Sequence, residues 1–346
     1  MKPYIQIGKR KIGSDFSPFV IAEIGINHEG SLKKARKMIE DAANVGAECV
    51  KFQCHVIEDE MIPAAKKVVP GNANESIWDI MSRCALSEKE DRELKEHTEK
   101  FGLIYLSTPF SRAAADRLHR MNVPAYKIGS GECNNYPLIE HIASFGKPII
   151  LSTGMNDMFS IKIAVKILRS KKVPYALLHC VSLYPTPYKN LSLGAIEELQ
   201  KTFPDAVIGL SDHSMGIYSC LGSVALGASI LEKHFTSNKT WPGPDISLSI
   251  SPRELKELII GSRAVYQSLG GKKTILKAEK PTIDFAYASV VTTQFIKKGD
   301  IFTKNNLWVK RPGTGEIKAI NYKNVLGRKA KRDIPADAQI RQKDVF

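Results

Sequence analysis

The stretches Val207-Ile-Gly-Leu-Ser-Asp-His213 and Ile230-Leu-Glu-Lys-His234-Phe-Thr each combine a short apolar run with polar residues at its end. Both runs have the length and composition of buried strands. Each run is closely followed by a histidine. A parallel barrel brings the ends of its strands to one face, where such folds keep their chemistry. Two imidazoles delivered in this way can hold a divalent metal, so these stretches indicate an enzyme.

The same pattern recurs along the first 270 residues, where apolar runs alternate with amphipathic helical stretches. Eight strands are expected, over residues 19–26, 48–53, 103–107, 125–129, 148–153, 175–180, 207–210 and 230–235. Helical patterns follow most of them, as over 31–45, 87–101, 161–169 and 252–269. Eight such units close most naturally into a (β/α)8 barrel. We therefore expect an α/β fold with a TIM-barrel catalytic domain over residues 1–270.

An alternative fold and a long insertion also have to be considered. A doubly wound open sheet is the alternative, but no G-x-G-x-x-G turn follows the first strand. A longer insertion, roughly residues 56–83, follows the second strand, and we expect it to form a flap over the barrel mouth.

The sequence changes character after Gly270, with a linker expected over 271–284 and a small β-rich domain over 285–346. Two stretches of this domain resemble each other, Ile296-Lys-Lys-Gly-Asp-Ile-Phe302-Thr-Lys-Asn-Asn306-Leu307 and Ile334-Pro-Ala-Asp-Ala-Gln-Ile340-Arg-Gln-Lys-Asp344-Val345. Each predicts a strand, a turn, a second strand and a short capped turn. A domain of about 60 residues is small for an independent core. We therefore expect this domain to pack against another surface, in its own chain or in a partner subunit.

The composition is that of an ordinary globular protein, with 43% hydrophobic and 25% charged residues among 346 and a mean hydropathy of −0.18. No apolar run approaches the ~20 residues that a membrane span needs, and the N-terminus lacks the apolar core of a secretory signal. Six cysteines are scattered without a C-x-x-C pair. These features predict a cytoplasmic protein, not bound to membranes, with reduced and mostly buried thiols.

The chain carries a net charge of +14, and half of this excess lies in residues 284–346, with 13 basic against 6 acidic residues. Such a balance invites a nucleic-acid interpretation. The basic residues are dispersed, however, with no recognised nucleic-acid motif and no basic-aromatic stripe. We expect no nucleic-acid partner, and attraction of anionic small substrates is the simpler explanation.

Lys51 and Lys127 lie inside otherwise apolar strands, and burying a lysine without a counter-charge is costly. A bound dianion such as phosphate would satisfy both, with hydroxyl donors from neighbouring strand ends, namely Ser130, Ser152 and Ser211. The alternative is that each lysine pairs with a structural carboxylate, such as Glu23 or Glu132. Either lysine could also form a Schiff base with a carbonyl substrate.

For His213 and His234 the alternative is two unrelated histidines, each hydrogen-bonded at its own strand end. Their separation of 21 residues is one strand–helix unit and carries no weight by itself. They end consecutive barrel strands, however, so their side chains can meet. His28 and His55 are weaker candidates, and His179 lies within a strand as a core histidine.

At these residues the sequence resembles the sialic acid synthases, enzymes that condense phosphoenolpyruvate with an amino sugar. The matching stretches include AEIGINHEGS from Ala22, LSTPFSR from Leu106, YKIGSGECNNYPLI from Tyr126, GLSDHS, LEKHFT and, near the C-terminus, LWVKRPGTG. Their order and spacing match along essentially the whole chain. The resemblance implies a barrel joined to an antifreeze-like (SAF) domain. It also implies a domain-swapped homodimer in which that domain covers the partner's active site.

The resemblance further implies a role for individual residues. His213 and His234 match the divalent-metal ligands, with Mn²⁺ the usual ion and Mg²⁺ or Co²⁺ as alternatives. Glu23 matches an acidic residue near the metal-bound water and the substrate carbonyl. The phosphoenolpyruvate site corresponds to Lys51, Gln53, Thr108, Lys127, Ser130, Ser152 and Ser211. The amino-sugar pocket corresponds to Phe110, Tyr184, Asp245 and Arg311, the last reaching the site of the partner subunit.

The implied reaction joins phosphoenolpyruvate, N-acetylmannosamine and water to give N-acetylneuraminate and phosphate. Two departures concern the sugar: Ser182 replaces an asparagine of many sialate-making members, and the segment after Asp245 lacks a histidine that many relatives have. The same condensation on a precursor of legionaminate or pseudaminate is therefore the alternative. Outside enzymes, the basic C-terminal domain could be a polyanion-binding module.

Overall fold

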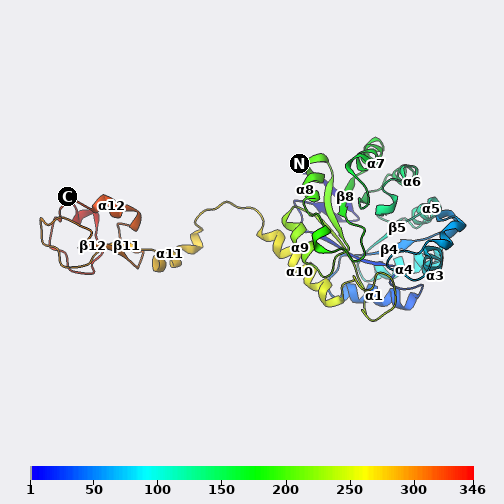
Figure 1. The fold of residues 1–346 in the computed structure, drawn as a ribbon, viewed down its shortest axis with the longest axis horizontal. Helices are drawn as coiled ribbons and strands as arrows, with labels where there is room; N and C mark the ends of the chain where they lie inside the picture. Colours follow the sequence, from blue (N-terminus) through cyan, green and yellow to red (C-terminus); the bar gives the residue numbers. More distant parts are fainter. Residues whose placement is uncertain (1) are drawn as a thin grey trace. The chain divides into compact units, whose positions relative to one another are not determined.

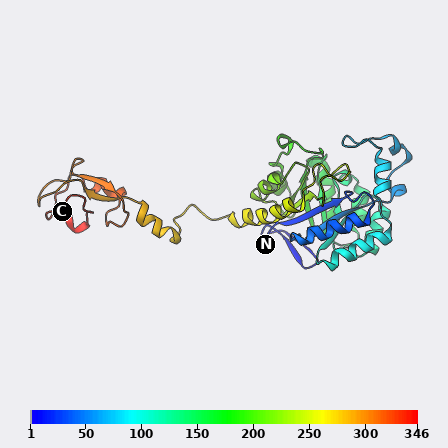
Figure 2. The same ribbon diagram turned by 90° about the horizontal axis from the view of Figure 1, so that it is seen from below.

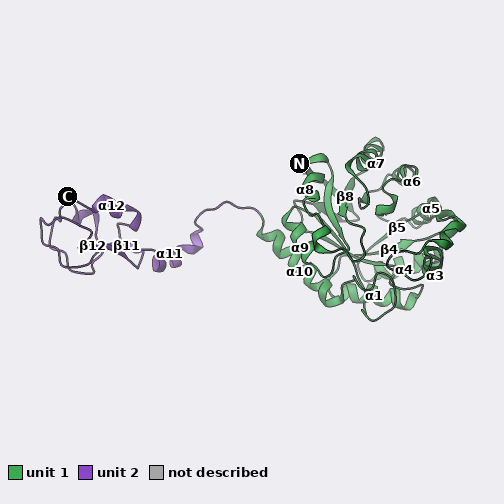
Figure 3. Ribbon diagram, in the orientation of Figure 1, with its two compact units in different colours: residues 1–269 green, residues 270–346 purple. Residues whose placement is uncertain are grey.

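The computed structural model describes residues 2–346, which form two compact units divided between Leu269 and Gly270 (Figure 3). In the described part of the chain, no helix is both long enough and apolar enough to span a membrane. All six cysteines are buried and free of disulfides.

The first unit is built on an eight-stranded parallel sheet in the order β5-β4-β3-β10-β9-β8-β7-β6, curled into a nearly closed barrel (Figures 1 and 2). The expected TIM-like fold is thereby confirmed, and the strands fall within a few residues of their expected places. Their bounds are β3 Phe19–Gly25, β4 Cys49–Cys54, β5 Ile104–Pro109, β6 Tyr126–Ile128, β7 Ile149–Ser152, β8 Tyr175–Cys180, β9 Val207–Asp212 and β10 Ile230–His234.

Helices follow the strands and cover the outside of the barrel (Figure 1). Their bounds are α1 Leu32–Asn44, α4 Glu88–Lys100, α5 Arg112–Arg120, α6 Tyr136–Ala143, α7 Met158–Ser170, α8 Ala195–Thr202, α9 Tyr218–Ala225 and α10 Pro252–Ser268. Several begin at a side chain that accepts a hydrogen bond from the first turn, and Ser87 and Ser251 form full capping boxes. The expected insertion contains α2 Ile57–Glu60, a short 3₁₀ helix Pro63–Lys67 and α3 Ile77–Cys84.

The strands have two different faces because successive side chains point to opposite sides. Outward residues such as Leu210 and Leu231 pack with the helices in the larger apolar cluster. Inward residues such as Phe19 and Ile230 form a second cluster inside the barrel. Gly209 on β9 fits this interior because an added Cβ would lie 2.5 Å from the carbonyl oxygen of Ile230.

An N-terminal hairpin, β1 Tyr4–Ile7 and β2 Arg10–Gly13, was not among the expected strands. Ile5, Ile7 and Ile12 of this hairpin belong to the apolar cluster inside the barrel. The hairpin therefore completes the packing at the amino-terminal end of the strands. Its only signal in the sequence is a short alternation of isoleucines, which is easily missed without a following helix.

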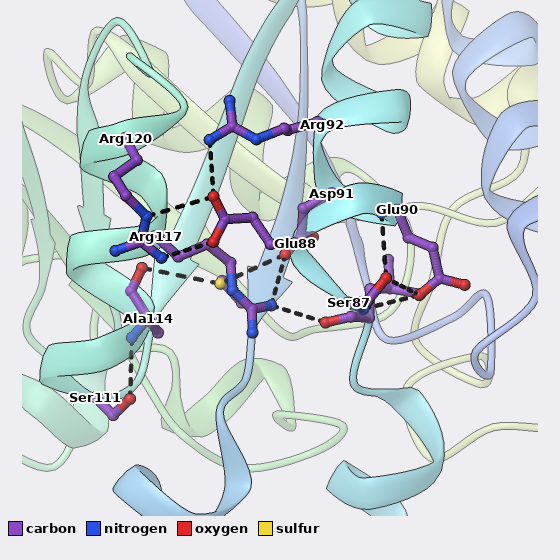
Figure 4. A network of polar contacts seen from close by, with 11 residues as sticks. Ser87, Glu88, Glu90, Asp91, Arg92, Ser111, Ala114, Arg117 and Arg120 are labelled. Atoms are coloured by element: carbon purple, nitrogen blue, oxygen red, sulfur yellow. Dashed lines mark hydrogen bonds and ion pairs between the residues drawn. The ribbon is translucent and has the colours of Figure 1, made fainter.

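A buried ion pair links α4 to α5 behind β4 (Figure 4). Arg117 donates to the carboxylate of Asp91 at 2.9 Å and to the carbonyl of Leu86 at 2.7 Å. The thiol of Cys54 on β4 lies 3.7 Å from the same carboxylate. Burial raises the pKa of Asp91 to about 6, although Arg117 opposes the shift. The network thus connects α4 and α5 to each other and to β4.

The second unit has its own core, centred on Val290, Phe302, Leu307, Ile334 and Ile340. It contains α11 Lys280–Ala286, β11 Ser289–Thr292, β12 Leu307–Lys310 and α12 Tyr322–Val325. The segment expected as a linker is thus partly helical, since a 3₁₀ turn over Lys277–Glu279 and α11 occupy its second half. Pro281 near the start of α11 suits a first helical turn, where its missing N–H is not needed.

The two similar stretches of the second unit pair with each other. Ile296 and Ile334 exchange backbone hydrogen bonds of 2.9 and 2.8 Å. Asn306 and Asp344, at equivalent positions, each accept a hydrogen bond from the backbone N–H three residues earlier. The internal repeat is therefore structural as well as sequential, although it forms isolated bridges and not the regular strands expected.

Candidate active site

The inward face of the barrel changes from apolar to polar within two residues on each strand. Each change occurs near the carboxyl end of its strand. The pairs are Ile21 and Glu23, Cys49 and Lys51, Leu106 and Thr108, Ala125 and Lys127, Ile150 and Ser152, Leu178 and Cys180, Gly209 and Ser211, and Ile230 and Glu232. The strands thus present one polar layer on top of the apolar interior.

This layer forms the floor of a cavity of about 330 Å³. Twelve of the residues expected in the site line it: Glu23, Lys51, Gln53, Thr108, Phe110, Lys127, Ser130, Ser152, Tyr184, Ser211, His213 and His234. Asp245 lines an adjoining cavity of about 230 Å³, which shares Gln53, Tyr184 and His234 with the first. The structure therefore gathers the barrel residues of the expected site in one place.

Arg311 lies outside this cluster, in the second unit directly after β12. Its side chain is exposed, and its guanidinium lies 5.6 Å from the ring centre of Phe285.

Both buried lysines pair with carboxylates. Lys51 lies 2.7 Å from Glu23, and its ammonium also donates to Thr108 at 2.9 Å. Lys127 lies 3.2 Å from Glu232, which is itself 3.9 Å from Lys51. The argument that an anion is needed to balance two unpaired lysines is therefore wrong. The expected pairing of a lysine with a carboxylate is found for Glu23. Glu132 instead accepts a hydrogen bond from Asn135, and Glu232 is the second carboxylate that pairs with the lysines.

The two carboxylates of this cluster differ in acidity. Burial raises the pKa of Glu23 to about 7, although Lys51 lowers it and Glu232 raises it further. Burial also raises the pKa of Glu232, but Lys127 and Lys51 together bring this pKa below the ordinary value. At neutral pH Glu23 can therefore exchange a proton while Glu232 stays ionised.

Gly25 leaves room for the Glu23 side chain at a bulge of β3. Its φ of +54° is a conformation that side-chain-bearing residues rarely adopt. An added Cβ would also lie 3.1 Å from Oε1 of Glu23. The glycine in the motif AEIG is therefore required by the placement of the carboxylate.

His213 and His234 meet at the mouth, with ring centres 5.5 Å apart. Nδ1 of His213 donates to the carbonyl of Val181 at 2.9 Å, which leaves Nε2 with the lone pair when the ring is neutral. Tyr184 stacks on this ring with centres 4.1 Å apart. The pairing of consecutive strand ends thus brings together the two histidines, as expected.

His234 is the less satisfied of the two rings. Its Nδ1 is buried without a hydrogen-bond partner, and the nearest carboxylate oxygen, on Asp245, is 3.7 Å away. Burial and the neighbouring His213 lower its pKa well below the ordinary value, so the ring is neutral at pH 7. A buried nitrogen with a free lone pair fits a metal ligand.

The protein supplies only part of a metal coordination shell. Among residues 2–346 there is no group of three or more His, Cys, Asp and Glu arranged to hold an ion. Two imidazoles therefore fit a divalent ion only if water or substrate completes its coordination, as in open catalytic sites.

The weaker histidine candidates have other partners. His179 bonds the carbonyl of Leu191 at 2.6 Å, as a core histidine would. His28 accepts from the N–H of Gly30. His55 bonds Gln53 at 3.1 Å and stacks on Phe110. It therefore orients two residues that line the larger cavity.

The insertion after β4 contributes to the cavity walls. Pro70 and Asn72 line both cavities. Ile77, Ile80 and Met81 of α3 line the smaller one. This segment therefore borders the barrel mouth, where the sequence analysis placed a flap.

Two ionisable side chains of the site were not expected there, namely Glu232, which lines the cavity, and Cys180, which lies next to His213. The signal for Glu232 is its spacing, because it lies two residues before His234 on the same strand face. Cys180 lies 3.7 Å from Nδ1 of His213, and Glu232 accepts from Ser211 at 3.0 Å. Both positions follow from the period of two once the strands are fixed.

Comparison with known proteins identifies the families to which the two units are similar. A model of the NeuB family matches residues 38–274, and a model of the SAF domain matches residues 287–345. The N,N'-diacetyllegionaminic acid synthase of Campylobacter jejuni is 39% identical, over 93% of this chain and 98% of its own. The human N-acetylneuraminate-9-phosphate synthase is 35% identical, over 96% and 93%.

A solved N-acetylneuraminic acid synthetase from Leptospira borgpetersenii is 35% identical, with a TM-score of 0.75 over 82% of this chain and 96% of its own. The fold and these matches define a synthase that condenses phosphoenolpyruvate to make a nonulosonate. The chain belongs to the NeuB family and carries its SAF domain. The resemblance seen in the sequence motifs is thus confirmed.

Proposed function

We propose that the protein condenses phosphoenolpyruvate with N-acetylmannosamine and water, giving N-acetylneuraminate and phosphate. Carbon 3 of phosphoenolpyruvate forms a bond to the aldehyde carbon of the open-chain sugar. Water adds to carbon 2, and phosphate leaves with its bridging oxygen. The same chemistry on a different N-acyl hexosamine would give legionaminate or pseudaminate.

The observation that carries this proposal is a set of unsatisfied polar atoms around two paired lysines. The buried hydroxyls of Ser152 and Ser182 and Nδ1 of His234 have no hydrogen-bond partner within the described residues. Buried polar atoms in native proteins are nearly always satisfied. Their clustering around Lys51 and Lys127 supports a polar ligand that completes the layer.

Lys51 and Lys127 would bind the phosphate and carboxylate groups of phosphoenolpyruvate, helped by nearby hydroxyls. The ion pairs with Glu23 and Glu232 give both ammonium groups a counter-charge without a ligand, although burial lowers the pKa of Lys127. The lysines are thus held in place before substrate arrives, which lowers the reorganisation needed on binding.

Glu23 would accept a proton from the attacking water or return one to the new hydroxyl. Its raised pKa, about 7, suits such a role at neutral pH. Its carboxylate lies against Lys51, and its strand position is directly opposite His234. It therefore stands between the proposed phosphoenolpyruvate and aldehyde ends of the site.

A divalent metal would be held by His213 and His234, since enzymes of this family are generally metal-dependent. When bound, it would supply Lewis-acid polarisation of the aldehyde oxygen. Mn²⁺ is the ion we expect. The hydrogen bond from Nδ1 of His213 to Val181 leaves Nε2 of that ring free to bind a metal. The ring of His234 is neutral and can bind the metal as well.

The acceptor is expected to carry no phosphate. The human relative makes a 9-phosphate product, and joining three carbons to a hexosamine makes carbon 9 of the product carbon 6 of the acceptor. Among residues 2–346, the only lysine or arginine side chains lining the two cavities are Lys51 and Lys127, and both are paired. In the described part of the chain, most side chains that line the smaller cavity are apolar, and Asp245 is its one acidic residue. Since Arg311 of the partner subunit is proposed to contact the N-acyl group, this supports an uncharged acceptor, which includes the 6-deoxy precursor of legionaminate.

Phosphate release with phosphoenolpyruvate and Mn²⁺ tests the reaction and the acceptor together. The panel is N-acetylmannosamine, its 6-phosphate and a 2,4-diacetamido-2,4,6-trideoxyhexose. We expect kcat/KM for an unphosphorylated sugar to exceed that for the 6-phosphate by at least about tenfold, a discrimination of about 1.4 kcal/mol. A preference for the 6-phosphate would contradict the acceptor assignment, and no turnover with any sugar would contradict the reaction.

We propose that the active form is a homodimer in which Arg311 acts in the partner's site. Large exposed apolar side chains follow three neighbouring strands at the barrel mouth: Met155, Phe159, Leu183, Tyr188, Met215 and Tyr218. In the second unit Phe295, Trp308 and Ile320 are also exposed. Such patches are typical of interaction surfaces.

Subunit complementation tests this arrangement. His234→Ala and Arg311→Ala proteins, each inactive with the amino sugar, are unfolded together and refolded. If Arg311 acts across subunits, mixed dimers contain one intact site and regain up to about half of the wild-type activity per mixed dimer. If Arg311 acts within its own chain, no mixed dimer is intact and the activity stays at the level of the parents.

A further inference from the structure

We propose that the buried ion pair between Asp212 and Lys233 is a positioning element that fixes the spacing of His213 and His234. This inference rests on the proposed metal role of the two histidines. Each member of the pair directly precedes one of the histidines in the sequence. The two residues face the helices, whereas the histidines face the cavity.

The pair couples the last residue of β9 to the penultimate residue of β10. Asp212 and Lys233 are direct partners in the parallel register. Their side chains are fully buried, and the ammonium lies 2.8 Å from Oδ2 of the carboxylate. Because side chains alternate along a strand, the next residue on each strand points into the barrel. The ion pair therefore acts one residue behind each imidazole.

The same two side chains hold the chain beyond His213. Lys233 also donates to the carbonyl oxygen of Ser214. Asp212 accepts from the N–H of Ser214 at 3.0 Å and from the hydroxyl of Ser219 at 2.7 Å. Lys233 therefore bonds to the residues on both sides of His213, namely Asp212 and Ser214. This arrangement ties the backbone of one histidine directly to the strand that carries the other.

A merely structural explanation does not account for the choice of residues. A buried ion pair can often be replaced by hydrophobic side chains of similar volume without loss of stability. The other outward positions on these strands, such as Leu210 and Leu231, are apolar and pack with the helices. What an ion pair adds is a fixed direction and distance, which an open two-histidine site needs.

The test compares Mn²⁺ affinity in the full-length wild type, Lys233→Met and the double variant Asp212→Leu/Lys233→Met. The double variant removes both charges and therefore keeps the fold even where Lys233→Met alone leaves a buried carboxylate. Mn²⁺ binding is measured by calorimetric titration, and phosphoenolpyruvate binding by the same method. The matched control is Arg117→Met, which breaks a buried ion pair of the same barrel away from the site.

We expect the double variant to bind Mn²⁺ about 10- to 100-fold more weakly, the range found when residues that orient metal ligands are changed. Phosphoenolpyruvate affinity should stay within about twofold, and Arg117→Met should keep its Mn²⁺ affinity while losing stability. Wild-type Mn²⁺ affinity in a folded double variant would overturn the inference. An equal loss of affinity in Arg117→Met would also overturn it, since the effect would then follow general destabilisation. A wild type that binds no divalent ion would refute the metal assignment in the proposed function and the inference with it.

Discussion

Lys51 and Glu23, on adjacent strands of the barrel, form a buried ion pair of 2.7 Å at the centre of the polar layer. Lys51 also approaches Glu232, so one ammonium faces two carboxylates of different acidity. The raised pKa belongs to Glu23. We infer from this difference in pKa that Glu23 carries the exchangeable proton and that Glu232 keeps its charge.

Glu23→Gln should lower kcat by about 10²- to 10⁴-fold, the range for loss of a general acid–base group. The carboxylate form of Glu23 increases as pH rises through about 7. If it acts as a base, wild-type kcat should therefore rise with pH across that value and fall below it. The variant should lack this limb when kcat is measured from pH 5.5 to 8.5. A limb that persists unchanged in Glu23→Gln would assign the proton to another group.

Lys127→Met should weaken phosphoenolpyruvate binding and also destabilise the protein. It leaves Glu232 facing only the more distant Lys51, and breaking a buried pair costs about 3–5 kcal/mol of unfolding free energy. Lys127→Met/Glu232→Gln should regain much of that stability, as measured by urea denaturation. The KM for phosphoenolpyruvate should remain high in both proteins. Restored KM in the double variant would show that Lys127 has no direct contact with the substrate.

His234→Ala should abolish most of the condensation and weaken Mn²⁺ binding. Lewis-acid polarisation contributes several kcal/mol, so a fall of at least about 100-fold in kcat is expected. His97→Ala on α4 is the matched control, because that ring pairs with Glu40 on the outside of the barrel. Chelation of the wild type should reproduce the defect. Full activity in chelator would rule out the metal role.

Arg117→Met should lower the free energy of unfolding by about 3–5 kcal/mol, because Asp91 would be left as a buried and unpaired carboxylate. Arg120→Met is the control on the same helix, since its pair with Glu88 is exposed and should contribute less than about 1 kcal/mol. Both ion pairs are drawn in Figure 4, and urea denaturation measures the stability of both variants. Equal losses would mean that burial of the Asp91 pair is not what stabilises this helix contact.

The barrel was predictable because its strands and helices leave periodic signals. Runs such as 207–210 and 230–235 are apolar, end in polar residues and recur at strand–helix intervals, so the number and place of the strands could be inferred. Because the ends of parallel strands meet at one face of a barrel, the two histidines and the lysines Lys51 and Lys127 could be expected near one another. The N-terminal hairpin gave no comparable signal and was missed.

The partners of the lysines were not predictable. The sequence offered Glu132 as readily as Glu232, since both follow or lie within expected strands. Only the pairing of β10 with its neighbours places Glu232 3.2 Å from Lys127, whereas Glu132 lies in a 3₁₀ turn after β6 and accepts a hydrogen bond from Asn135. Likewise Asp245, which belongs to a segment without periodic structure, could be assigned a site only through the family resemblance.

The amino-acid sequence by itself determined the class of fold, the family and the inward face of each strand, because these depend on local periodicity and on motifs contiguous in the chain. The tertiary structure decided which charges meet and which polar atoms stay unsatisfied. Those properties depend on register between strands far apart in the sequence. That is why Asp212 and Lys233, ordinary polar residues when read in order, become a buried pair that joins the strands of the two histidines.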